Sequence, residues 1–86
     1  MNDKLATPGS PEYQNLMRLA ARAMGWSVAR RHYTNPSGRC FHITPDGKIA
    51  CTEVRRYGFC DTWRKKMEDT LRRYGPLGFF YNYRHW

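Results

Sequence analysis

Apolar positions follow a helical period in the first part of the chain. They recur every three or four residues over 11–24 and form one stripe: Tyr13, Leu16, Met17, Ala20 and Met24. Ser10 is a preferred helix N-cap, and Pro11 suits the first helical position. Gly25 follows the stripe, where a left-handed residue commonly ends a helix. This pattern predicts a helix over 11–24.

In the middle of the chain, apolar and polar residues alternate on both sides of Thr44-Pro45-Asp46-Gly47-Lys48. Proline, aspartate and glycine in this order favour a type I turn that closes with a bulge at Gly47. Arg39–Thr44 and Lys48–Val54 are therefore predicted to form a β-hairpin, in which Arg39 lies opposite Glu53. The register of this hairpin places one apolar set on a common face: Phe41, Ile43, Ile49 and Cys51.

The remaining pattern predicts further elements. Trp26–Tyr33 is predicted to be one strand, and Arg55–Cys60 a connector. A second helix is expected to begin at Asp61 and to stop at Gly75-Pro76. The aromatic segment Phe79–Trp86 is predicted to be a last strand.

The expected fold is therefore a single α+β domain over residues 10–86, preceded by a flexible tail over 1–9. The expected order is helix, three strands, helix, and a C-terminal strand. The antiparallel sheet would have three to four strands, with both helices packed on one face. The other face would then carry Cys40, His42, Ala50 and Thr52, and we expect that a homodimer could form through it.

Charge indicates the class of partner. The chain has 86 residues, and its 15 Lys and Arg against 7 Asp and Glu give a net charge of +8. This excess favours nucleic acid or an acidic protein surface as the partner. The sequence shows neither a membrane-spanning run nor a signal peptide, and Cys40, Cys51 and Cys60 fit no recognised disulfide framework. We therefore expect a cytoplasmic protein.

Cysteine and histidine residues raise the question of zinc. The candidate ligands are Cys40, His42, Cys51 and Cys60, with His32 in reserve. The hairpin register places Cys51 on the face opposite Cys40 and His42, which argues against a metal site, although a plain two-residue turn would instead pair His42 with Cys51. Cys60 has no positioned base near it in sequence. We expect no metal, no cofactor and no enzymatic activity.

Arginines carry the main candidate binding site. In the predicted up-down-up meander, the ends of the strands gather five of them with two tyrosines: Arg30, Arg31, Arg39, Arg55, Arg56, Tyr33 and Tyr57. The start of the second helix would emerge beside them and add oriented N–H groups. Basic residues within that helix are instead expected to pair with Glu68 and Asp69. The aromatic tail 79–86 is expected to pack into the core, with stacking on nucleobases as the alternative.

The order helix, three strands, helix over Ser10–Gly75 resembles the double-stranded RNA-binding domain, and Arg64-Lys65-Lys66 is similar to the basic start of that family's second helix. The resemblance implies that Lys65 and Lys66 contact phosphates. The chain is also similar, in a less specific way, to small proteins encoded by phages. We therefore expect a non-enzymatic module that binds the nucleic-acid backbone. The alternative is a phage- or mobile-element-type inhibitor that docks on a host protein.

Overall fold

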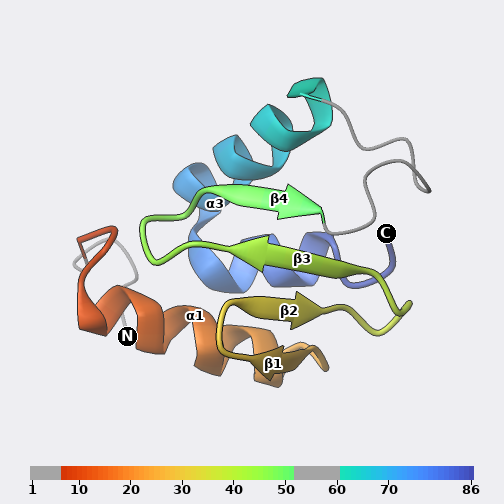
Figure 1. The fold of residues 1–86 in the computed structure, drawn as a ribbon, viewed down its shortest axis with the longest axis horizontal. Helices are drawn as coiled ribbons and strands as arrows, with labels where there is room; N and C mark the ends of the chain where they lie inside the picture. Colours follow the sequence, from red (N-terminus) through yellow and green to blue (C-terminus); the bar gives the residue numbers. More distant parts are fainter. Residues whose placement is uncertain (1–6, 52–60) are drawn as a thin grey trace.

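The computed structural model describes residues 7–51 and 61–86. Its elements are α1 (Pro11–Ala23), β1 (Ser27–Ala29), β2 (His32–Thr34), β3 (Cys40–Ile43), β4 (Ile49–Cys51) and α3 (Asp61–Asn82). The strands form one antiparallel sheet in the order β1-β2-β3-β4. Both helices lie behind this sheet in Figure 1. The predicted α+β class is confirmed.

Helix α1 follows its sequence signals. The Tyr13 backbone N–H donates to the Ser10 side chain at 3.1 Å, which caps the first turn. Gly25 has a φ of 84° and leads the chain out of the helix. The stripe is buried at Tyr13, Met17 and Ala20. Ahead of the helix, the Gly9 N–H donates to the Pro45 carbonyl at 2.9 Å, so residue 9 lies against the β3–β4 turn.

The register of the predicted hairpin is confirmed over residues 41–51, whereas Glu53, the predicted partner of Arg39, lies outside the described residues. Phe41 lies opposite Cys51, and Ile43 lies opposite Ile49. Thr44 N–H donates to the Lys48 carbonyl at 2.9 Å. Gly47 has a φ of 89°, and a Cβ there would lie 3.2 Å from Leu71 Cδ2. The positive φ of the turn therefore favours glycine, and a Cβ there would require the Leu71 side chain to shift by a few tenths of an ångström.

The prediction of one strand over Trp26–Tyr33 is wrong. The chain reverses at Arg30 and Arg31, so that Ala29 pairs with His32 and Val28 with Tyr33. Arg30 has a φ of 56°, the one positive value among the described non-glycine residues. Reversal brings Tyr33 beside Phe41, where its ring is buried. The sequence gives little sign of this turn because it contains neither glycine nor asparagine.

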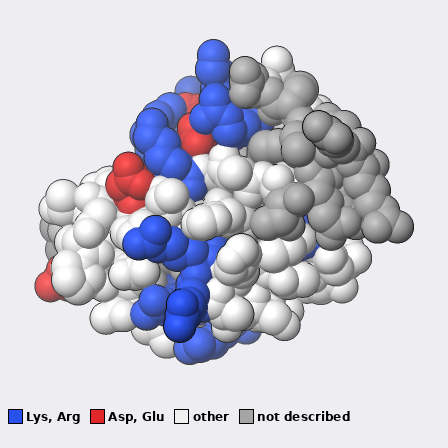
Figure 2. All heavy atoms as spheres, in the orientation of Figure 1, with Lys and Arg blue, Asp and Glu red and all other residues white. Residues whose placement is uncertain are grey.

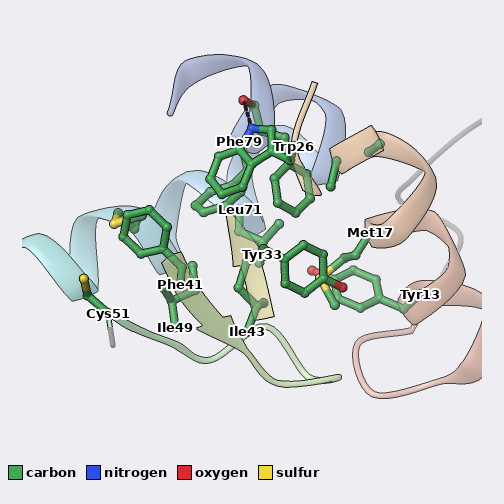
Figure 3. Packing of buried hydrophobic residues seen from close by; sticks show 14 residues of the cluster. Tyr13, Met17, Trp26, Tyr33, Phe41, Ile43, Ile49, Cys51, Leu71 and Phe79 are labelled. Carbon is green, nitrogen blue, oxygen red and sulfur yellow. Dashed lines mark hydrogen bonds between the residues drawn. The ribbon is translucent and has the colours of Figure 1, made fainter. Parts of the chain in front are cut away.

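The predicted last strand is also wrong. Helix α3 continues to Asn82 after a kink at Gly75, whose φ is 77° and ψ 176°. Gly75 thus ends the first helical segment as predicted, and Pro76 begins a second segment. Phe79 and Phe80 are fully buried, which follows from the helical spacing 76, 79, 80, 83. In Figure 3 the dashed line marks the Trp26 Nε1–H donating to the Phe80 carbonyl, at 3.0 Å.

The two faces of the sheet differ in burial. One face contributes five buried side chains to the core between sheet and helices: Tyr33, Phe41, Ile43, Ile49 and Cys51. On the other face His32 and Ala50 are exposed, and Cys40 and His42 are half-buried. The predicted open face is confirmed for Cys40, His42 and Ala50, whereas Thr52 lies outside the described residues.

Candidate functional site

The predicted convergence of Arg30 and Arg31 with Arg39 at one end of the sheet does not form. The Arg31 carbonyl accepts from Ile43 N–H at 2.9 Å, which places the Arg30-Arg31 turn beside the far end of β3. Arg39 precedes β3 and lies four residues from Ile43, or about 14 Å along the strand. The extra turn at 30–31 causes this separation, because it reverses the chain one strand earlier than predicted. Arg55, Arg56 and Tyr57 lie outside the described residues.

Tyr33 was predicted to be an exposed stacking residue, and this prediction is wrong. Only 1 % of its surface is exposed, and its ring stacks on Phe80 with centroids 5.4 Å apart. Burial raises the pKa of its phenol, and the positive charges of Arg18 and Arg22, together with a hydrogen bond from Arg18, partly oppose this rise. The ring belongs to the core, and its hydroxyl interacts with a basic side chain of α1.

Helix α3 neutralises much of its own charge, as predicted. Arg64 Nη1 lies 3.5 Å from Glu68 Oε2, and Asp69 pairs with Arg72 and Arg73 at 3.2 and 3.7 Å. Glu68 also accepts a 2.8 Å hydrogen bond from Ile49 N–H, so its carboxylate caps the edge of β4. Lys65 and Lys66 are exposed on the same helix.

Of the zinc candidates, Cys60 lies outside the described residues, and the others do not come together. Cys51 is 7 % exposed and faces the core, whereas Cys40 and His42 lie on the open face. Cys40 Sγ lies 3.9 Å from His32 Nδ1, and the rings of His32 and His42 are 5.2 Å apart. Within residues 7–51 and 61–86, no three His, Cys, Asp or Glu side chains are placed to hold a metal ion.

An open groove between α1 and the β1–β2 turn is the strongest candidate site. It has a volume of about 460 Å³ and is lined by Asn15, Arg18, Leu19, Arg22, Val28 and Arg30. Arg18 and Arg22 stand one helical turn apart and therefore share a face of α1. Arg30 joins them because the turn between β1 and β2 brings it back to the helix.

The groove is positively charged and its lining contains no carboxylate. Among the ion pairs of the described residues, none involves Arg18, Arg22 or Arg30. Like charges at i and i+4 cost a helix a few tenths of a kcal/mol. In Figure 2, basic side chains gather at the lower edge of the face shown, over α1 and the β1–β2 turn, with no acidic side chain among them. Such a groove attracts anions.

The groove could not be predicted from the sequence because it depends on tertiary structure. Arg18 and Arg22 fall on the exposed face of the predicted helix, where arginines are ordinary. Their meeting with Arg30 requires the turn at 30–31, which the pattern did not reveal. The one feature of the sequence that could have indicated the turn is the polar dipeptide Arg30-Arg31 between two short runs with β propensity.

Among the described residues, no helix is both long enough and apolar enough to cross a bilayer. Comparison of the chain with protein-family models, curated proteins and solved structures found no match.

Proposed function

We propose that this protein is a small non-enzymatic module that binds the phosphate backbone of nucleic acid through the groove between α1 and the β1–β2 turn. The observation that carries the proposal is the gathering of Arg18, Arg22 and Arg30 around a groove without a carboxylate in its lining. Guanidinium groups donate bidentate hydrogen bonds to phosphate oxygens. The net charge of +8 adds long-range attraction to a polyanion.

Binding of this kind depends steeply on salt. Three phosphate contacts give a slope of log K against log [salt] of about −2 for a single strand and about −2.7 for a duplex. Affinity then falls about 20- to 40-fold between 50 and 200 mM KCl. Contacts with the backbone alone carry no base readout, so affinity should vary little with base sequence.

Charge reversal of the two exposed arginines tests the site. Arg22 and Arg30 are exposed, so the double variant R22E/R30E should fold, and pairing of the new carboxylate at 22 with Arg18 should leave its thermal stability equal or slightly higher. The matched control is R72E/R73E, which makes the same change in net charge on α3. Binding is measured by fluorescence anisotropy with labelled 20-nucleotide DNA at 50–200 mM KCl.

We expect R22E/R30E to lower the affinity at least tenfold and to flatten the salt dependence. The control should lose much less, because Arg72 and Arg73 lie at 3.2 and 3.7 Å from Asp69 and outside the groove. Equal losses in the two variants would show that only net charge matters, and would reject the groove.

A second candidate function is docking on a protein, as an inhibitor of the kind that phages and mobile elements encode. It is favoured by three large exposed apolar side chains on α3: Tyr74 at 62 %, Leu77 at 47 % and Tyr81 at 53 %. A stoichiometric protein partner that survives nuclease treatment, and is lost in Leu77→Arg, would support this function over nucleic-acid binding. The implied phosphate contacts of Lys65 and Lys66 stay a prediction that the same binding assay can test.

A further inference from the structure

Two tryptophans and two basic side chains form a second surface, at the end of the sheet away from the groove. The rings of Trp63 and Trp86 are 5.5 Å apart and inclined by 52°. Lys66 Nζ lies 5.0 Å from the Trp63 ring centre, and Arg39 Cζ lies 5.0 Å from the Trp86 ring centre. These four residues, Arg39, Trp63, Lys66 and Trp86, are called the tryptophan surface below.

The fold holds this surface in place from behind. The Asn35 side chain donates to the Tyr83 and Trp86 carbonyls at 3.1 and 3.3 Å, and it accepts from Arg39 N–H at 2.8 Å. Only 3 % of Asn35 is exposed, so these bonds are partly shielded from water. The buried Phe41 ring lies 5.7 Å from the Trp86 ring. Arg39 and Trp86, far apart in sequence, are therefore fixed to the same loop.

Trp63 is partly exposed, at 39 %, although tryptophan is the side chain that contributes most when it is buried. Lys66 contacts its face through an exposed and flexible side chain. An aromatic face that a mobile cation covers can accept a nucleobase, while the cation moves to the adjoining phosphate. Proteins that bind single strands combine aromatic rings with basic groups in this way.

We propose that Trp63 of the tryptophan surface stacks on unpaired nucleobases, so that the protein prefers single-stranded over double-stranded nucleic acid. This inference rests on the proposed binding of the backbone in the arginine groove and adds a substrate class to it. In a duplex the base faces are stacked within the helix and cannot reach Trp63. In a single strand they can, and loss of one stacked base lowers affinity about 5- to 150-fold.

The experiment compares three ligands on the full chain: a 20-nucleotide thymidine single strand, a duplex of the same length, and inorganic polyphosphate, which has no bases. Trp63→Leu is the test variant. Tyr74→Leu is the control, because Tyr74 is an aromatic residue that is 62 % exposed on the same helix. We expect Trp63→Leu to weaken binding of the single strand at least fivefold, with polyphosphate binding unchanged and the control unaffected.

Tryptophan fluorescence gives a second measurement on the unaltered protein. Trp26 is 3 % exposed and Trp63 is 39 % exposed, so quenching on binding should come mainly from Trp63. The single strand should quench the emission, and polyphosphate should not. Equal affinity for single strand and duplex, no quenching by the single strand, or equal effects of Trp63→Leu and Tyr74→Leu would overturn the stacking proposal. Binding of polyphosphate that R22E/R30E abolishes would leave the arginine groove standing, whereas absence of all binding would reject both.

Discussion

Asn35 offers a test of how the structure is held together, because its side chain joins the β2–β3 loop to the end of the described chain. Asn35→Ala removes the two bonds to the Tyr83 and Trp86 carbonyls and the bond from Arg39 N–H. At a net value of about 1 kcal/mol for each hydrogen bond, the free energy of unfolding should fall by about 2–3 kcal/mol. For a domain of this size the melting temperature should drop by about 10–20 °C.

Asn35→Asp provides a second test, because the stability of this variant should depend on pH. The new carboxylate would still accept from Arg39 N–H, but it would face the Tyr83 and Trp86 carbonyl oxygens. Burial beside these acceptors raises the pKa of that carboxyl in the folded state above its unfolded value of about 3.9. The protonated form can donate again. The stability lost relative to the native chain should therefore be recovered below about pH 4 and be lost as the pH rises through the folded pKa.

The assay is thermal and urea unfolding of the native chain, Asn35→Ala and Asn35→Asp, followed by circular dichroism at pH 7 and pH 4. A loss below about 0.5 kcal/mol for Asn35→Ala would refute the reasoning, because three hydrogen bonds of a buried side chain should together contribute about 2–3 kcal/mol. A deficit of Asn35→Asp that does not change with pH would show that its carboxyl does not face the two carbonyls.

Two further predictions concern packing and titration. Gly47→Ala should lower the free energy of unfolding by about 1 kcal/mol more than Gly38→Ala. Both residues have a positive φ, but only at Gly47 would the new Cβ contact Leu71, at 3.2 Å. Equal losses in urea unfolding would mean that backbone strain alone lowers the stability. Arg18→Gln should raise the already elevated pKa of Tyr33 further, as followed by NMR of its ring carbon Cζ, because it removes a charge that lowers this pKa. Since the folded pKa of Tyr33 exceeds 10, the stability that its neutral phenol provides should be complete below pH 10 and fall as the pH rises through that pKa.

Local signals in the sequence were sufficient to predict an element where one residue determines the backbone conformation. Gly47 and its neighbours define the hairpin and its register, and Ser10 and Gly25 define the ends of α1. These elements could be predicted because turn and cap chemistry acts over four or five residues. The stop at Gly75-Pro76 was predicted for the same reason.

The predictions of secondary structure were wrong where packing between residues far apart in the sequence determines the backbone conformation. Phe79 and Phe80 have high strand propensity, yet they form a helix because Pro76, Phe79 and Phe80 then enter the core together. The turn at Arg30 lacks a glycine, and it forms because Tyr33 must lie beside Phe41. The prediction of the candidate site was wrong for the same reason. The predicted arginine cluster depended on one long strand over 26–33, whereas the arginine groove depends on the turn at 30–31 that interrupts this strand.

The arginine groove and the tryptophan surface lie toward opposite ends of the sheet. The Arg31 carbonyl accepts from Ile43 N–H, and Ile43 lies four residues, or about 14 Å along β3, from Arg39. A single strand that contacts both sites must span at least this distance, whereas polyphosphate bound in the arginine groove alone need not.

The most direct test of phosphate binding in the groove is NMR of the arginine Nε–Hε groups during titration with the thymidine 20-mer at 50 mM KCl. Binding in the groove predicts that Arg18, Arg22 and Arg30 shift first and saturate together, while Arg72 and Arg73 move little. Shifts confined to α3, or spread evenly over all arginines, would contradict a phosphate site between α1 and the β1–β2 turn.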